Sequence, residues 1–516
     1  MQKNKVISKL GEYLPHLLFF LSAWFLLSIY YGDVMYIAQQ NSFFSTKASL
    51  MDFVTSHRPY GYLWWLGRAF LQLFYYPILG GAVTSLMLAL ISGLIMYVFR
   101  IRQKFALLQF LPAFLWIGYL FFQGYELYYQ AETGMILGIP LCVLIILILQ
   151  SGFIRTFSKR RIYSTFAIVS TSQKQRFLDC LVILFVPLLL ILGSEQLRPY
   201  VRPTAHMQRS MQAENWEEMK RTAKECKISA RPIAAYYAIA LMQTGEITQS
   251  LFDIEYNYMD LYLHDRNGGK DFGTAYYESD GNFYAGLINT AYRNALEQLT
   301  MDGPSALNLK RLAEASLLNG EHKLCEKYLK ILESMPFESE FVERTKALNK
   351  NTELVAQNTR LNTILQLRPV EDSFETLYRE PLFLGYNIAL LQGRSIEALH
   401  ASLAACLYSK LIPNFLIRTE PLVNSTLPQN VQDALIMESD KNPNISKIFQ
   451  FDEFSLQKYE VFLNMSASYK GRREIGAKEL KKQFLGFYPY YYYYGNIHSE
   501  SQKTESTEKK SETRVN

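Results

Sequence analysis

The sequence has few of the residue patterns that mark redox, zinc or hydrolytic chemistry. Its five cysteines are scattered among 516 residues, with no CxxC motif and no close pair, which argues against a disulfide framework or a structural zinc site. The seven histidines are isolated along the chain. No phosphate-binding loop, hydrolase nucleophile motif or metal-ligand cluster is present, so we expect neither a metal nor another cofactor.

Long apolar runs are absent from the chain after residue 193. Before that point five runs occur, each near the roughly 20 residues that cross a hydrocarbon core. They cover residues 14–31, 81–99, 105–122, 133–149 and 177–193. The sequence therefore predicts an all-α fold with a polytopic helical membrane domain at residues 1–193. The first run is too long for a signal peptide and no cleavage site follows it, so we expect a retained signal anchor.

Acidic residues are missing from two loops between these runs. The loop at residues 100–104 carries three basic residues, and the loop at 151–176 carries six. Both loops should face the cytoplasm, which requires that residues 61–78, an aromatic stretch with Arg68 in its middle, do not cross the membrane. We expect this stretch to lie in the outer interface with Arg68 reaching the headgroups. A sixth span with Arg68 paired internally is the alternative.

On this count the N-terminus is cytoplasmic and the chain from residue 194 onward is extracytoplasmic. For a bacterial protein, this topology predicts a multi-pass protein of the inner membrane with a periplasmic C-terminal domain. Much of the net charge of +6 sits in short loops, so it indicates topology and a lipid bilayer partner, and no nucleic acid. The spans hold few ionisable residues, chiefly Asp179, which argues against a transporter or channel.

Strand-like alternation is scarce after residue 215, where Asn215 opens the first of many amphipathic helical patterns. Three segments resemble one another and turn at glycines 75 and 73 residues apart, close to two periods of a repeat in the mid-thirties. They are residues 236–251, 313–329 and 386–403, with the glycines Gly245, Gly320 and Gly393. These segments resemble tetratricopeptide-like repeats, which implies a soluble α-solenoid at residues 194–497 whose concave surface binds a protein partner. A plain irregular helical domain is the alternative.

The end of the predicted solenoid is rich in aromatic residues. Residues 484–495 include five consecutive tyrosines after Pro489. We interpret this run as an aromatic cap over the last repeat. A sugar-stacking platform is the alternative, because aromatic faces suit saccharide rings. Residues 498–516 consist mainly of Ser, Thr, Glu and Lys, which predicts a disordered tail.

The region around the first span carries a pattern that points to chemistry. An outer loop is expected to open with Gly32 and Asp33 after the span. A helix is expected near residues 38–44, and an HRPY motif at residues 57–60 leads into the aromatic stretch. This order resembles the N-terminal module of the polyprenyl-phosphate-sugar-dependent glycosyltransferases of the GT-C superfamily. The resemblance implies that Asp33 is the base that takes a proton from the acceptor hydroxyl. It also implies that Arg58 or Arg68 meets the phosphate of a lipid-linked sugar.

The chain departs from that superfamily in two ways. A second acid often accompanies the first in those enzymes, but Val34 follows Asp33 here. The remaining acidic candidates are distant in the chain: Asp52, Glu126 and Glu132. Those enzymes also usually have more spans than five or six. A second interpretation of Asp33, as a polar residue that ends a span at the headgroup level, therefore stays open.

The layout as a whole is similar to an uncharacterised family of multi-span membrane proteins from the Bacteroidota with a helical-repeat C-terminal half. That family has no assigned activity, so the similarity implies architecture and compartment alone. Two functions follow from these observations. The first is a scaffold whose periplasmic solenoid binds a protein or an envelope component, and it needs no catalytic residue. The second is a GT-C-type glycosyltransferase with Asp33 as its base.

Overall fold

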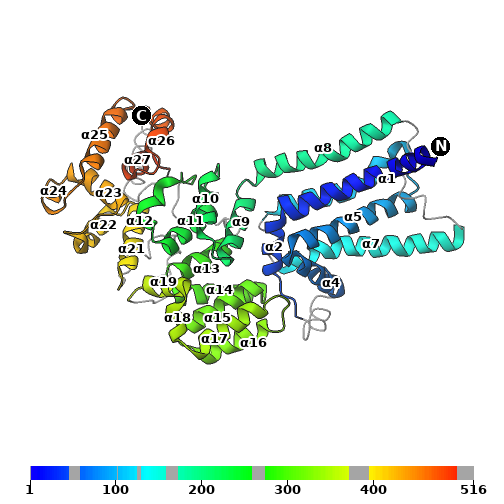
Figure 1. Ribbon diagram of the computed structural model, residues 1–516, viewed down its shortest axis with the longest axis horizontal. Coiled ribbons are helices and arrows are strands. Elements are labelled where there is room, and N and C mark those ends of the chain that lie inside the picture. Colours follow the sequence, from blue (N-terminus) through cyan, green and yellow to red (C-terminus); the bar gives the residue numbers. More distant parts are fainter. Residues whose placement is uncertain are drawn as a thin grey trace, which may run out of the picture. The chain divides into compact units, whose positions relative to one another are not determined.

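The computed structural model describes residues 2–45, 59–101, 103–124, 130–158, 173–258, 274–370 and 394–496 (Figure 1). Within these ranges every regular element is a helix, and an isolated bridge joins Ser229 to Tyr256. The predicted all-α fold is confirmed. Gly393 and the tail predicted at residues 498–516 lie outside the described residues.

Five helices in the described chain are long and apolar enough to cross a membrane, as the sequence predicts. Their apolar segments are Tyr13–Tyr30, Pro77–Val98, Phe105–Gln123, Thr133–Thr156 and Phe177–Leu197. The elements that carry them are α1 (Gln2–Phe25) with the π-helix η1 (Leu26–Tyr30), α5 (Pro77–Val98), the 3-10 helix η3 (Gln103–Phe110) with α6 (Leu111–Gln123), α7 (Gln130–Ser158) and α8 (Gln173–Leu197). In Figure 1, α1, α5, α7 and α8 run side by side.

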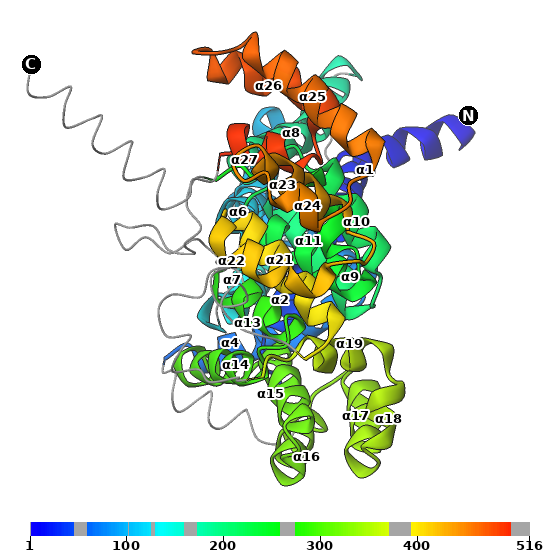
Figure 2. The same ribbon diagram turned by 90° about the vertical axis from the view of Figure 1, so that its left-hand side faces the viewer.

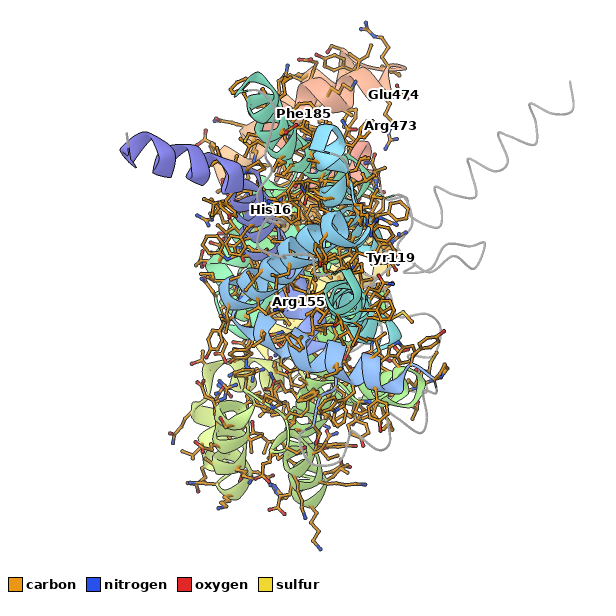
Figure 3. All side chains as sticks on the ribbon, turned by 90° about the vertical axis from the view of Figure 1, so that its right-hand side faces the viewer. His16, Tyr119, Arg155, Phe185, Arg473 and Glu474 are labelled. Atoms are coloured by element: carbon orange, nitrogen blue, oxygen red, sulfur yellow. The ribbon has the colours of Figure 1, made fainter. Side chains whose placement is uncertain are left out.

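The outward faces of these helices are apolar. Exposed side chains of α1 and η1 recur every three or four residues and form one stripe, namely Leu14, Leu17, Leu21, Phe25 and Ile29. Along α8 apolar side chains are exposed over most of the length, and Phe185 is labelled on this helix in Figure 3. Continuous apolar faces of this size are rare on proteins in water. The arrangement therefore fits a helical bundle in a lipid bilayer.

Residues 61–78 contain α4 (Gly61–Leu71) and the 3-10 helix η2 (Gln72–Tyr75), which are separate from the five candidate spans. The 11 residues of α4 reach about 16 Å, roughly half of the hydrocarbon thickness. The stretch is therefore shorter than the five candidate spans. That it does not cross the membrane stays a prediction, with a sixth span as the alternative. Its position in the outer interface stays a prediction.

Small residues bring helices of the bundle into backbone contact. A Cβ atom on Gly81 of α5 would lie 2.0 Å from Ser28 Oγ of η1. A Cβ atom on Gly67 of α4 would lie 2.0 Å from Gly134 O and 2.7 Å from Gly138 N of α7. Lipid tails are as apolar as leucine, so helices in a membrane associate through close packing of this kind.

The C-terminal ends of α1, α6 and α8 meet. Tyr30 Oη donates hydrogen bonds to Ile191 O (3.3 Å) and to Glu195 Oε1 (3.0 Å) at the end of α8. Tyr31 Oη donates to Leu120 O near the end of α6 (3.4 Å). The first, third and fifth spans thus run in the same direction, as an alternating five-span bundle requires. The chain after α8 leaves the bundle at the end opposite to the N-terminus of α1.

The segment after the first span is helical sooner than expected. Gly32 and Asp33, expected in an outer loop, form the first turn of α2 (Gly32–Gln40). The chain turns at Tyr31 alone, directly after η1, and no loop separates the two elements. The helix expected near residues 38–44 therefore begins several residues earlier than predicted.

The chain folds into two compact units. Unit 1 comprises Met1–Ala205, Gln298–Lys310 and Lys327–Arg344, and unit 2 comprises His206–Glu297, Arg311–Glu326 and Thr345–Asn516. Two segments of the helical half therefore belong to the same unit as the membrane helices. The predicted division at residue 193 placed these two segments in the C-terminal domain, apart from the membrane helices.

The helical half consists of many short helices. They are α9 (Val201–Gln212), α10 (Trp216–Glu225), α11 (Arg231–Thr244), α12 (Ile247–Ser250), α13 (Thr274–Tyr284), α14 (Ile288–Asp302), α15 (Ala306–Leu318), α16 (His322–Leu332), α17 (Ser339–Lys350), α18 (Glu353–Gln357), α19 (Thr359–Leu367), α21 (Ile396–Tyr408), α22 (Ile412–Arg418), α23 (Gln429–Ser439), α24 (Ile445–Ile448), α25 (Glu453–Ala467), α26 (Arg473–Phe484) and α27 (Tyr488–Tyr494). Figure 2 shows α25, α26 and α27 gathered near α23.

Local sequence signals place several of these helices. Asn215 caps α10, because its side chain accepts a hydrogen bond from the Glu218 N–H (3.2 Å), as predicted. Gly245 ends α11 at φ +75°, and Gly320 lies between α15 and α16 at φ +74°. These two glycine turns are where the sequence predicts them. The helix after Gly245 is shorter than expected, since α12 has 4 residues.

Candidate functional site

Asp33 stands in the first turn of α2 and is half-buried. The partial positive charge of a helix N-terminus favours the ionised carboxylate at this position. The preceding turn, η1, is π-helical, and π-helical turns at the ends or in the middle of α-helices are frequent at functional sites. The role of Asp33 as a base, which the glycosyltransferase resemblance implies, stays a prediction.

A group of tyrosine, arginine and glutamate side chains lies where the first span ends and the last span finishes. We name it the arginine collar and define it as Tyr30, Tyr31, Glu195, Arg198 and Arg202. Arg202 Nε donates to Tyr30 O (2.7 Å), and its guanidinium carbon lies 3.9 Å from the centroid of the Tyr30 ring. Arg202 also forms an ion pair with Glu195. Arg198 Nε donates to Phe122 O at the end of α6 (3.3 Å).

The arginine collar places two cations at the end of the bundle where the spans α1, α6 and α8 finish. Arg198 and Arg202 are both partly exposed. Guanidinium groups at such a position suit bidentate binding of a phosphate. The glycosyltransferase resemblance implies phosphate binding by Arg58 or Arg68 and does not point to this pair. The signal was present, since both residues directly follow the last span in the segment RPYVRP.

Arg68 lies at the far end of α2 from Asp33. It is 3% exposed, and its Nη1 is 3.5 Å from Phe43 O. Burial lowers the pKa of Arg68 to about 10. The 9 residues of α2, about 13 Å in length, separate Asp33 from this contact, so the structure does not bring the two side chains together. The expectation that Arg68 reaches the headgroups is wrong, because the chain after α2 lies against it.

The structure does not describe the side chains of the other candidate residues that were named with the glycosyltransferase resemblance. Arg58, Asp52 and Glu126 lie outside the described residues. Glu132 belongs to the first turn of α7, and its side chain is outside the described set as well. Their roles stay predictions.

A second group of polar side chains lies where α2 ends. We name it the polar joint and define it as Gln39, Gln40, Gln72, Lys310 and Glu338. Lys310 Nζ forms an ion pair with Glu338 Oε2 (2.6 Å) and donates to Gln40 Oε1 (2.9 Å). Gln40 Nε2 donates to Gln39 Oε1 (2.8 Å), and Gln39 Nε2 donates to Gln72 Oε1 (2.9 Å). All five residues belong to unit 1, and four of them are buried.

The polar joint connects the membrane-proximal helix α2 with two segments of the helical half. Glu338 is 1% exposed, so its charge relies on Lys310 for compensation. Beside it, the Phe337 ring stacks on Tyr75 with centroids 4.5 Å apart and planes at 11°. Phe337 has φ +66°, a conformation that bulky residues rarely adopt. The donors and acceptors of the joint satisfy one another, which is typical of a structural contact.

Unit 2 contains a buried network of charges. Glu314 forms ion pairs with Arg360 and with Arg311 (3.4 Å), and Arg311 Nη2 binds Asp280 Oδ1 (2.7 Å). The Arg311 guanidinium carbon also lies 3.8 Å from the centroid of the Phe283 ring. Burial alone would lower the pKa of Arg360, but the neighbouring carboxylate of Glu314 raises it. The network joins α13, α15 and α19 and balances its own charges.

The tyrosine run forms α27, which packs against α23 and α26. Its interpretation as a cap, over the last repeat or over the membrane-facing end of the domain, stays a prediction. The buried members of the run are Tyr488, Tyr490 and Tyr491. Two cations satisfy carbonyls at the end of this helix, since Lys410 Nζ donates to Tyr492 O (2.9 Å) and Arg473 Nη2 donates to Gly495 O (2.9 Å). Burial lowers the pKa of Lys410 to about 7. These contacts fix the run against the rest of unit 2.

A pocket of about 440 Å³ opens between α25, α26 and α27. Its walls include aromatic rings and two cations, namely Phe462, Tyr469, Tyr493, Tyr494, Lys470 and Arg473. The lining side chains contain no carboxylate. Part of the tyrosine run therefore faces an open pocket, and the saccharide-stacking interpretation stays open for Tyr493 and Tyr494.

Groups of three or more His, Cys, Asp or Glu side chains placed to hold a metal ion are not found within the described part of the chain. Neither a curated protein nor a solved structure matches the chain. A family of unknown function (DUF6057) matches residues 116–495, from within α6 to the end of α27. The match takes in the end of the third candidate span, the whole of the fourth and fifth, and the described helical half. Because it covers well over half of the sequence, the chain belongs to the DUF6057 family of unknown function.

Proposed function

We propose that this protein is an integral inner-membrane protein that presents its helical half in the periplasm to bind a protein or another envelope component. The polar joint carries the proposal. It ties the segments Gln298–Lys310 and Lys327–Arg344 of the helical half to α2 within one compact unit. The burial of Glu338 in this joint supports a role of these two segments next to the membrane helices.

The direction of the spans supports the periplasmic side. The chain leaves α8 at the end of the bundle opposite to the N-terminus. The basic loops at residues 100–104 and 151–176 follow the second and fourth spans, so an alternating bundle places them with the N-terminus. By the positive-inside rule that side is cytoplasmic.

Topology fusions test whether the helical half is presented outside the cytoplasm. Alkaline phosphatase fused after Asn496 should be active, and a fluorescent protein that folds in the cytoplasm should be dark at the same position. The matched fusions after Ser158, in the fourth span's basic loop, should show the reverse pattern. Fluorescence at Asn496 would place the helical half in the cytoplasm and refute the proposal.

A second candidate function is transfer of a sugar from a polyprenyl phosphate, with Asp33 as the base. The observation that favours it is the arginine collar, which supplies two cations where the spans α1, α6 and α8 end. In this mechanism Asp33 removes a proton from the acceptor hydroxyl while an arginine meets the leaving phosphate. The test is mass spectrometry of lipid-linked sugars in cells with Asp33→Asn. This candidate would be supported if cells with the variant accumulate lipid-linked sugars to the same level as a deletion strain while the variant is present in the membrane.

A further inference from the structure

We propose that the pocket between α25, α26 and α27 binds an acidic saccharide, that is, a sugar ring that carries a carboxylate. The proposal rests on the proposed function and deepens it, because it names a ligand class for the half of the chain that is presented. The volume of about 440 Å³ is within the usual range of small-molecule sites, roughly 300 to 1,000 Å³.

The aromatic wall of the pocket has the form of a stacking platform. Phe462 is buried, whereas Tyr493 is 41% exposed. Their ring centroids are 6.3 Å apart with planes at 25°, so Phe462 supports one side of the Tyr493 ring. The other face of an exposed, supported ring can stack on the apolar C–H face of a sugar.

The positively charged side chains of the pocket favour an anionic ligand. Lys470 and Arg473 both line it. Arg473 donates from Nε to Tyr493 O (3.2 Å) and from Nη2 to Gly495 O (2.9 Å). These bonds hold the guanidinium at the pocket and leave other N–H donors of the five for a carboxylate. Figure 3 shows Arg473 and Glu474 on the first turn of α26, and Glu474 does not line the pocket.

The hydroxyl groups of the pocket favour a saccharide over an acidic peptide. Ser466 Oγ and Tyr494 Oη lie 2.6 Å apart, and each can donate and accept a hydrogen bond, as sugar hydroxyls require. A peptide would bring backbone N–H groups that need carbonyl acceptors. The carbonyls at the end of α27 already accept hydrogen bonds from Arg473 and Lys410.

Isothermal titration of the full-length protein in nanodiscs tests the proposal with a matched pair of ligands. Trigalacturonate carries carboxylates, and galactotriose has the same rings without them. We expect trigalacturonate to bind at least about tenfold more tightly than galactotriose, because a charge-assisted hydrogen bond to the carboxylate is lost in the neutral sugar.

Three variants locate the binding site, and a fourth serves as control. Lys470→Gln should weaken trigalacturonate binding by about tenfold, and Tyr493→Ala by at least as much. Tyr493→Phe, which keeps the ring, should bind like the wild type. Lys478→Gln removes an exposed cation of α26 outside the pocket and should change nothing. Arg473 is left intact because its bonds to α27 are structural.

Several results would overturn the proposal. One is that galactotriose or inorganic phosphate binds as tightly as trigalacturonate. Another is that an acidic tetrapeptide binds more tightly than trigalacturonate. The last is that trigalacturonate does not bind at millimolar concentration. The topology fusions separate this failure from failure of the proposed function. If the pocket gives one of these results while alkaline phosphatase fused after Asn496 is active, the pocket assignment alone is wrong. If the fluorescent protein is bright at Asn496, the proposed function is wrong too.

Discussion

The two units of this chain are built on opposite principles. The membrane helices of unit 1 expose apolar side chains and pack through small residues such as Gly67 and Gly81. Unit 2 gathers many of its apolar side chains in a core, and its helix α11 is buried from residue 232 to residue 242. The hydrophobic effect therefore stabilises unit 2, whereas close packing and polar contacts stabilise unit 1. The same kind of substitution should have different effects in the two units.

The largest effect is expected in the ion network of unit 2. Glu314→Gln removes the carboxylate that Arg311 and Arg360 share, and breaking a buried pair costs about 3 to 5 kcal/mol. Hydrogen exchange should accelerate in α13, α15 and α19, and the thermal midpoint should fall. The control Glu326→Gln changes an exposed carboxylate of α16 and should stay within about 0.5 kcal/mol of the wild type. Similar results for the two variants would show that the network does not support unit 2.

The second prediction concerns pH. Asp433 is buried in α23, and burial raises its pKa to about 7 from 3.8. The folded state therefore binds more protons than the unfolded state between these values, so this group's contribution to stability falls as pH rises toward 7 and stays low above it. Asp433→Asn should slow hydrogen exchange of α23 at pH 8, by an amount equivalent to about 2 to 4 kcal/mol. At pH 4 the substitution should have little effect, and a pH-independent change would contradict the assignment.

The third prediction addresses packing in unit 1. Gly67→Ala places a Cβ atom 2.0 Å from Gly134 O, so α4 must move away from α7. Overpacking of this kind costs about 1 to 3 kcal/mol, and thermal unfolding in detergent measures it. Gly152→Ala is the matched control, because a Cβ atom there has no neighbour within 4 Å. Equal stability of the two variants would mean that α4 does not depend on the glycine contact.

The smallest effect is expected at the polar joint. Lys310→Met leaves the buried carboxylate of Glu338 uncompensated, but Lys310 is 20% exposed and water reduces the loss to about 1 to 2 kcal/mol. Hydrogen exchange should accelerate in α2 and around Glu338 together, since both ends of the joint are released. Lys330→Met, an exposed lysine of α16, is the control. Acceleration at Glu338 without a change in α2 would show that the joint does not couple them.

The sequence predicts the features that depend on neighbouring residues. The five candidate spans follow from local hydropathy, and the turns at Gly245 and Gly320 follow from the tolerance of glycine for positive φ. The contact of α4 with α7 was predictable as well, because Gly134 and Gly138 form a GxxxG motif. On the partner helix α4, the most conspicuous residue of the sequence is Arg68, which does not indicate this contact.

Contacts between distant parts of the chain could not be predicted from one sequence. Gln40 and Glu338 are 298 positions apart, and nothing local to either residue indicates the other. The arginine collar joins Tyr30 to Arg202, which are 172 positions apart. The burial of Arg68 also depends on such a contact, because the chain after α2 returns to lie against α4. From hydropathy alone, Arg68 is expected to extend toward the lipid headgroups.

The most direct test of the account is complementation of a deletion strain by two variants that reach the membrane at wild-type levels. One is Asp33→Asn, and the other lacks residues 215–495. The account predicts that Asp33→Asn restores the envelope glycan profile and growth, whereas the chain without the helical half restores neither. Failure of Asp33→Asn to restore the glycan profile would contradict a binding role and make the sugar transferase the better description.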